Sequence, residues 1–249
     1  MDLNLSDKTA AVVGGATGIG KAICLNLAAE GVKVGVIDKN IEAAEATAKE
    51  IQGKAVAANV DLTDFDSVSA AFAKVAADLG PVDIMVFADG KYDTFGTVKM
   101  TSVETWDSEL SYTLSGAFYC IRSVGPSMKA SKWGRMIILS NRAVTSGAYG
   151  QSAHIAAMAG LFGLTKTAAL EYSRANVTCN LVLPGLVDTP AYRALPEAIQ
   201  EKLLNKGLTK RLQEPAEIAN TVAYLCSDLA KGITGAEVDV TMGNELFVF

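Results

Sequence analysis

The sequence contains little histidine, and its few cysteines are widely separated. A single histidine, His154, stands among the 249 residues, which excludes a metal site made from several histidines of one chain. The four cysteines form no C-x-x-C pair, so we expect neither a redox-active dithiol nor a zinc site. Cysteines without such motifs are typical of a reducing compartment, which favours the cytoplasm. No metal ion is expected to take part in the function.

Basic clusters and long apolar stretches are also missing. The formal net charge is −5, and no run of lysine or arginine occurs, which argues against nucleic acids and anionic membranes as partners. No uninterrupted apolar run reaches the ~20 residues that span a bilayer. The first ten residues, MDLNLSDKTA, lack the charged and apolar regions of a signal peptide. We therefore expect a cytoplasmic protein that contacts neither nucleic acid nor a membrane.

What the sequence does contain is a regular alternation of short apolar strands and amphipathic helices. Half of the residues are hydrophobic, enough to bury a large core. Strands are expected at residues 9–13, 33–37, 54–59, 82–88, 135–140, 177–183 and 237–240. Helices are expected between them, including one that ends at Gly80, a long one from near residue 101 toward Met128, and a mobile helical lid at residues 191–208. Strands that alternate with helices in this way predict an α/β fold, a Rossmann-type doubly wound parallel sheet with helices on both faces. Because no linker or repeat interrupts the pattern, residues 1–249 are expected to form a single domain.

A glycine-rich turn joins the first strand to the first helix. The turn reads GGATGIG and contains Gly14, Gly18, Ile19 and Gly20. Glycines let the backbone turn tightly and approach a pyrophosphate, and the helix N-terminus offers free N–H groups to the anion. Asp38 ends the next strand, where a carboxylate accepts hydrogen bonds from an adenosine ribose and disfavours a 2′-phosphate. The pattern indicates a dinucleotide site that prefers NAD to NADP, and a glycine turn without a ligand is the alternative.

The third strand is followed by Asp61 and Leu62, and the fourth by Asp89 and Gly90. The polar residues after the third strand have two interpretations of equal weight. They form the edge of an adenine site, or they supply the N-cap of the next helix.

The chain resembles the short-chain dehydrogenase/reductase family along its whole length. The glycine turn matches the G-x-x-x-G-x-G loop of that family, and residues 184–189 match its P-G-x-V-x-T segment, which holds the nicotinamide carboxamide. Ile233-Thr234-Gly235 matches the turn before its final strand. The resemblance implies NAD as the cofactor, with contacts from Gly14, Gly18, Ile19, Gly20, Asp38, Asp61, Leu62, Gly90, Pro184, Gly185, Val187 and Thr189.

The departures from this family lie at its four reactive positions, which we call the tetrad positions. Asn141 stands in place of the active-site Ser, His154 in place of the Tyr, Met158 in place of the Lys and Thr113 in place of a helical Asn. In the family the Lys lowers the pKa of the Tyr, which is ordinarily about 10, and binds the nicotinamide ribose. Met158 can do neither. The sequence therefore predicts that the catalytic tetrad is lost.

Binding of NAD is also placed in question by the segment after the fourth strand. Where the family has Asn-Asn-Ala-Gly, this chain has Phe87-Ala88-Asp89-Gly90. An aromatic ring and a second carboxylate beside the adenosine half are expected to oppose a dianionic cofactor. Whether NAD still binds is left open by the sequence.

Three hypotheses follow from this combination. In the first, the chain is a catalytically degenerate subunit that supports an active NAD-dependent alcohol dehydrogenase or ketoreductase sibling within a hetero-oligomer, by default a tetramer. In the second, it is an active NAD-dependent oxidoreductase in which His154 is the acid/base and Asn141 polarises the substrate. In the third, it is a nucleotide-sensing regulator. Loss of all four tetrad positions favours the first.

Overall fold

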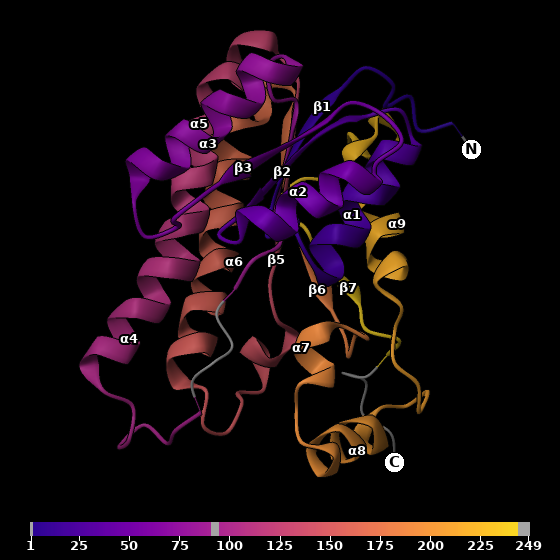
Figure 1. Ribbon diagram of the computed structural model, residues 1–249. Coiled ribbons are helices and arrows are strands. Elements are labelled where there is room, and N and C mark those ends of the chain that lie inside the picture. Colours follow the sequence, from indigo (N-terminus) through magenta and orange to yellow (C-terminus); the bar gives the residue numbers. More distant parts are fainter. Residues whose placement is uncertain (1, 91–94, 244–249) are drawn as a thin grey trace.

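The computed structural model describes residues 2–90 and 95–243, and these residues form a layered α/β fold around one sheet (Figure 1). The sheet has seven strands in the order β3-β2-β1-β4-β5-β6-β7, and all neighbouring strands run parallel. This confirms the expected doubly wound parallel sheet. The strands are β1 (Thr9–Val13), β2 (Lys33–Asp38), β3 (Ala55–Asn59), β4 (Ile84–Phe87), β5 (Gly134–Leu139), β6 (Val177–Pro184) and β7 (Glu237–Val240).

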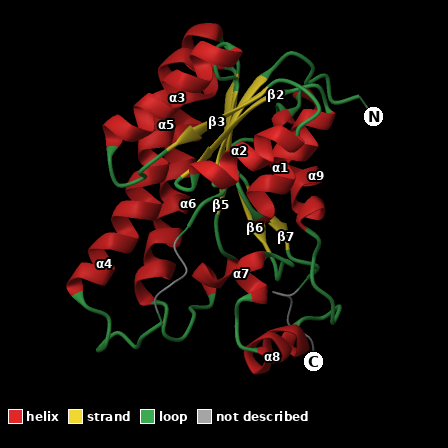
Figure 2. Cartoon of the chain, in the orientation of Figure 1, coloured by secondary structure: helices red, strands yellow, loops and turns green. Residues whose placement is uncertain are grey.

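Helices cover both faces of the sheet (Figure 2). One face is covered by α1, α2 and α9, and the other by α3, α5 and α6. The helices are α1 (Gly18–Ala29), α2 (Ile41–Glu50), α3 (Phe65–Leu79), α4 (Val103–Glu109), α5 (Gly116–Ser131), α6 (Ser152–Tyr172), α7 (Pro190–Arg193), α8 (Glu197–Lys206) and α9 (Pro215–Cys226).

The strands are buried on both faces, which explains why they read as continuous apolar runs. In β1, Ala11 and Val13 join the core under α3, α5 and α6, whereas Ala10 and Val12 join the core under α1 and α9. Successive side chains of a strand point to opposite faces, so a strand between two helical layers has no polar side.

Helix starts follow the expected capping chemistry. The Asn40 side chain accepts a hydrogen bond from the Ala43 N–H at the start of α2, and Asp64 accepts one from Asp66 N–H at the start of α3. At α9, Glu214 and Glu217 form a reciprocal capping box. These local bonds fix the points at which the chain leaves the sheet and enters each helix.

The long helix expected near residues 101–128 contains a turn that the sequence does not predict. The helical path runs from α4 through a π-helical segment, Leu110–Ser115, into α5. A π turn widens the helix locally and is frequent at functional sites. Thr113, one of the tetrad positions, lies within it.

Helix α6 is long and apolar enough to span a membrane, but its inner face packs in the core of this fold. Residues 152–175 contain an apolar window of which 44% is buried inside the structure. Its inner residues Ala157, Met158 and Leu161 contact the sheet. A core helix passes the same test of length and composition, and the outer face of α6 still exposes Leu170.

The segment expected to form a helical lid contains two short helices, α7 and α8. Both lie at the lower end of the molecule in Figure 1, beyond β6 and β7. Tyr192 anchors α7 because its hydroxyl donates to the Gln200 carbonyl, 2.9 Å away. Helix α8 has no buried residue.

Candidate functional site

The predicted site residues gather at the carboxyl ends of the parallel strands. The strand order places β1 between β2 and β4, so the order in which successive strands join the sheet reverses at β1, although β1 and β4 run parallel. Ligands of open α/β sheets bind in the crevice at such a switch point. The glycine turn follows β1, Asp38 ends β2 and Asp89 follows β4, so all three border this crevice.

The glycine turn has the geometry of an anion-binding loop. Gly14 and Gly18 adopt positive φ angles of 76° and 54°, and a Cβ on Gly20 would lie 2.0 Å from the Gly14 carbonyl oxygen. Thr17, the N-cap of α1, makes no side-chain cap, and the first turn holds no acid. The N–H groups at the start of α1, around Ile19, therefore fit a pyrophosphate.

Asp38 is buried and ties β2 to the glycine turn. Its Oδ2 accepts a hydrogen bond from Ala16 N–H at 3.1 Å, and its Oδ1 accepts one from Asn40 N–H at 3.0 Å. Each carboxylate oxygen has two lone pairs. Asp38 therefore retains the capacity to accept a bond from a ribose hydroxyl.

The polar residues after β3 were expected either to border an adenine site or to cap the next helix, and the structure assigns the cap to one of them. Asp64, not Asp61, caps α3. Asp61 Oδ1 accepts bonds from Thr63 Oγ1 at 2.7 Å and Thr63 N–H at 2.9 Å, and the Thr63 hydroxyl bond lowers the pKa of this exposed carboxyl. The Leu62 side chain is buried next to Gly116. An adenine can thus be met by Asp61 and by the backbone of Leu62, and this role stays a prediction.

The segment after β6 crosses in front of the glycine turn. Gly185 N–H donates to Gln213 Oε1 at 3.0 Å, and a Cβ on Gly185 would lie 2.7 Å from the same oxygen. Thr189 Oγ1 caps α7, and a Cβ on Gly18 would lie 3.4 Å from Thr189 Cγ2. Val187 is buried. Pro184 ends β6. That these residues hold a nicotinamide, as the resemblance implies, stays a prediction.

Asp89 and Tyr112 form a contact across the crevice that the sequence does not reveal. Asp89 Oδ2 accepts a bond from the Tyr112 hydroxyl at 2.9 Å, and Asp89 Oδ1 accepts one from Gly90 N–H at 2.7 Å. Burial raises the pKa of Asp89. Burial and the neighbouring Asp89 also raise the pKa of Tyr112. The Lys39 ammonium lies 5.5 Å from the centroid of the Tyr112 ring.

The expectation for Phe87 was wrong. Its side chain is fully buried in the core beneath α3 and α5 rather than in the crevice. The last residue of β4 points to the helical layer, because side chains alternate along a strand. Of the two residues expected to oppose a cofactor, only Asp89 borders the crevice.

The tetrad positions are occupied by side chains that serve packing and capping. Thr113, His154 and Met158 are 0%, 2% and 2% exposed. The Asn141 Oδ1 accepts a bond from Ala143 N–H at 2.9 Å and so caps a 3-10 turn. Met158 belongs to the hydrophobic core, and Ser140 Oγ donates to its carbonyl oxygen at 3.0 Å.

A buried carboxylate that the sequence analysis missed lies beside His154. Glu109 of α4 is fully buried, and its Oε2 is 3.9 Å from His154 Nδ1. The sequence could have pointed to Glu109 through its spacing. Glu109 precedes Thr113 by four residues and so shares a helix face with a tetrad position. His154 is thus the one titratable group among the tetrad positions, and a carboxylate faces it.

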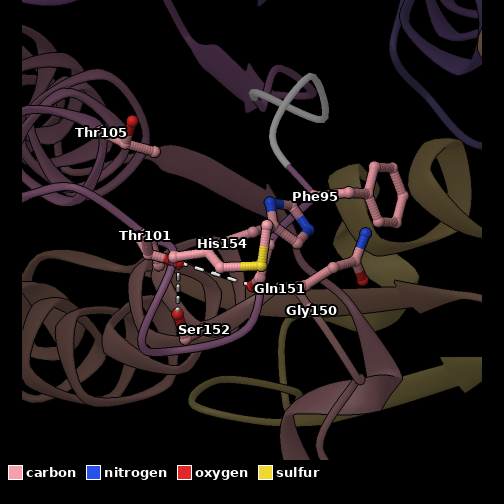
Figure 3. A pocket seen from close by; sticks show the side chains of 10 residues that line it. Phe95, Thr101, Thr105, Gly150, Gln151, Ser152 and His154 are labelled. Atoms are coloured by element: carbon pink, nitrogen blue, oxygen red, sulfur yellow. Dashed lines mark hydrogen bonds between the residues drawn. The ribbon is translucent and has the colours of Figure 1, made fainter.

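A hollow of about 210 Å³ opens next to His154, between the starts of α4 and α6. Figure 3 shows the imidazole near Thr101 and Ser152 on one side and Phe95 and Gln151 on the other. Thr101 Oγ1 and Ser152 Oγ lie 3.4 Å apart. None of the residues that line the hollow belongs to the glycine turn. It can hold a small polar molecule beside the imidazole.

The groups of the crevice differ in how they suit NAD, the cofactor that the resemblance implies. The glycine turn and Asp38 fit a pyrophosphate and the adenosine ribose. The hydrogen-bonded pair of Asp89 and Tyr112, close enough to Asp38 to feel its charge, does not fit the adenosine half.

Comparison with known proteins gives long matches. A family model described as enoyl-(acyl carrier protein) reductase matches residues 14–245. The 3-oxoacyl-[acyl-carrier-protein] reductase FabG of Staphylococcus epidermidis is 36% identical over 241 residues, which are 95% of this chain and 98% of the relative. Nodulation protein G of Azospirillum brasilense is 36% identical over 243 residues, 96% of this chain and 98% of the relative.

A further relative is named as part of a larger enzyme. It is subunit BbsD of the (2S)-[(R)-hydroxy(phenyl)methyl]succinyl-CoA dehydrogenase of Thauera aromatica, 33% identical over 248 residues, 98% of this chain and 99% of the relative. The family model covers both the glycine turn after β1 and the Pro-Gly segment after β6. The chain therefore belongs to the short-chain dehydrogenase/reductase family, whose members typically bind NAD or NADP.

Proposed function

We propose that this chain is a catalytically degenerate subunit that assembles with an active NAD-dependent alcohol dehydrogenase or ketoreductase of the same family and supports its structure or regulation. The observation that carries the proposal is the state of the tetrad positions. Three of the four side chains are almost fully buried, and the fourth, Asn141, is a cap of the following turn.

The chemistry explains why these substitutions matter. Hydride transfer to a carbonyl needs an acid that protonates the developing alkoxide, and the reverse reaction needs a base. In the family the positive charge of the Lys lowers the pKa of the Tyr that acts as this acid or base. Each unit of pKa corresponds to about 1.4 kcal/mol. Met158 carries no charge and lies in the core. The chain thus keeps a scaffold without the groups that drive the reaction.

Exposed apolar side chains on the long helices support assembly. Trp106, Phe118 and Leu170 are 39%, 43% and 79% exposed and lie on α4, α5 and α6. The relative from Thauera aromatica is named as a subunit, which fits a chain that works beside a related one. We place the assembly in the cytoplasm, as a hetero-oligomer with two-fold symmetry and by default a tetramer.

A second candidate is an active oxidoreductase that uses His154. The buried carboxylate of Glu109, 3.9 Å from His154 Nδ1, favours it, because a carboxylate fixes the tautomer of an imidazole and supports an acid/base role. The hollow beside the imidazole gives room for a substrate. This candidate requires NAD in the crevice.

Turnover by the isolated chain separates the two candidates. The purified protein is assayed with NADH and a panel of 3-oxoacyl thioesters and simple ketones, with and without the active sibling. We expect no turnover above background from the chain alone. Turnover that is lost in His154→Ala but kept in the exposed control Glu104→Ala would overturn the proposal in favour of the second candidate.

A further inference from the structure

We propose that Asp89, Tyr112 and Lys39 form a bridge that closes the adenosine end of the crevice and prevents this chain from binding NAD. The inference rests on the proposed function and deepens it, because a supporting subunit has no need of its own cofactor. In this proposal the three side chains block NAD, and the glycine turn and Asp38 remain able to bind it once the bridge is removed.

Asp89 lies against the glycine turn. A Cβ on Gly14 would lie 2.9 Å from Asp89 Cβ and 2.8 Å from the Ala88 carbonyl oxygen. Asp89 therefore packs directly against the turn that follows β1, at the point where the strand order reverses. A ligand that crosses from one half of the sheet to the other has to pass this point.

A hydrogen bond holds Asp89 and Tyr112 together. The Tyr112 hydroxyl donates to Asp89 Oδ2 at 2.9 Å, and a hydrogen bond to a charged acceptor is stronger than one between neutral groups. Tyr112 comes from the π-helical segment on one side of the crevice, whereas Asp89 comes from the end of β4. The pair thus spans the crevice from helix to strand.

The space beside the Tyr112 ring is narrow. Lys39 follows Asp38 at the end of β2, and its ammonium lies 5.5 Å from the ring centroid. A flat base inserted between the two would need about 3.5 Å on each of its sides, roughly 7 Å in all. The gap is too narrow for an adenine. Lys39 is exposed and can move, so Asp89 and Tyr112 form the fixed part of the bridge.

Charge acts in the same direction. Asp38 and Asp89 place two carboxylates around one crevice, and the proximity of Asp38 is one of the effects that favour the protonated form of Asp89. A pyrophosphate would bring further negative charge, and like charges at close range repel. Lys39 offsets this in part, since it favours the ionised form of Asp89.

Titration of the purified full-length chain with NAD⁺ tests the bridge by calorimetry. We expect no saturable binding to the wild type up to about 1 mM. The double variant Asp89→Ala/Tyr112→Val removes the bridge and is expected to gain at least about tenfold in affinity. Adding Asp38→Ala to the double variant should abolish the gain, which would show that NAD⁺ occupies the dinucleotide site.

Two controls separate the causes. Asp89→Asn keeps the acceptor for Tyr112 and removes the charge, so it should gain less than the double variant if filling of the crevice dominates. Asp66→Ala removes an exposed acid on α3 and should change nothing. Circular dichroism establishes that each variant is folded.

Saturable binding of NAD⁺ by the wild type would overturn the inference without any variant. A folded double variant with no gain would also overturn it, because the bridge would then not be the barrier. Neither result decides the proposed function, which depends on turnover and on assembly with a sibling. If the chain binds NAD⁺, shows no turnover of its own and assembles with an active sibling, the proposed function still holds.

Discussion

At the scale of single residues, the positions that carry chemistry in the family carry packing in this chain. Met158 lies in the core, Asn141 caps a turn, and His154 is enclosed against Glu109. A position that has no catalytic role can hold a side chain that packs better in the fold. The contact between Glu109 and His154 gives two predictions for stability.

We expect Glu109→Ala to be strongly destabilising. Removal of this fully buried side chain leaves a cavity and takes a polar contact away from the buried imidazole, which together cost about 2–5 kcal/mol. For a chain of this length the melting temperature should fall by roughly 10 °C. Thermal unfolding followed by circular dichroism measures the change.

The matched control for that prediction is Glu104→Ala, an exposed acid on the same helix, which should change the melting temperature little. The double variant Glu109→Leu/His154→Phe replaces the pair by apolar groups and should recover most of the loss. If the double variant loses as much stability as Glu109→Leu and His154→Phe lose together, the two side chains do not couple.

Because the pKa of Asp89 is raised in the folded chain, we expect the stability of the protein to depend on pH. Burial raises the pKa of Asp89 above its ordinary 3.8, so the folded chain holds a proton there more tightly than the unfolded chain does. The ionised carboxylate therefore lowers stability at neutral pH, and this loss disappears below the unfolded pKa. Asp89→Asn should raise the urea midpoint at pH 7, and the gain should shrink toward pH ~4. A gain that grows as the pH falls would contradict the raised pKa.

The residue scale is also where prediction from sequence reaches its limit. Asp38 and the glycine turn were predictable because their spacing follows from one strand, one turn and one helix. Tyr112 was not, because its contact with Asp89 joins residues 23 apart through a π-helical segment. Phe87 was placed wrongly, because the resemblance gives a position in the chain but not the face of the strand.

At the scale of elements, close approach between β2 and α3 sets the thickness of the layers. A Cβ on Gly35 would lie 2.5 Å from one γ carbon of Val75 and 2.6 Å from the other. Val75 is fully buried in the core. Since interiors are packed as densely as crystals, no room remains for a methyl group at Gly35.

We expect Gly35→Ala to lower the free energy of unfolding by about 1–3 kcal/mol through overpacking. Adding Val75→Ala should give back part of that loss, because it removes the atoms that the new methyl group meets. Urea unfolding of the single and double variants measures the coupling. Gly53→Ala, where a Cβ would meet only Ile51 Cγ2 at 3.9 Å, is the control. Strictly additive losses would contradict the close contact.

Strands and most helices of this chain could be predicted from periodicity and capping. The limits of β1 and β7 agree with those expected from the sequence, and Gly80 ends α3 as expected. The π turn was missed because one extra residue per turn leaves the apolar spacing on either side unchanged. The segment after β6 was read as one helical stretch, but Pro196 and the buried Tyr192 divide it into α7 and α8.

At the scale of the whole molecule, the outer faces of the long helices are the surface most in need of a partner. Phe118 and Leu170 are 43% and 79% exposed on neighbouring helices of the same layer. Large apolar side chains that are left exposed on one layer of helices are candidates for burial against a partner. The proposed assembly with a related chain would cover them.

The double variant Phe118→Glu/Leu170→Glu should weaken assembly by at least about tenfold in dissociation constant while the chain stays folded. Two carboxylates in an apolar contact lose hydration without gaining partners. Light scattering behind gel filtration measures the mass. Leu229→Glu, an apolar residue of similar exposure on the other side of the sheet, should leave the mass unchanged. Equal effects of the two changes would exclude α5 and α6 as the interface.

In the proposed assembly this chain supports an active sibling. The native mass of the protein isolated from its source cells, measured with ionisation mild enough to keep subunits and nucleotides bound, tests this proposal. We predict a complex with a second chain of similar size, with NAD present only in proportion to that second chain. A homo-oligomer that carries one NAD for each copy of this chain would contradict it.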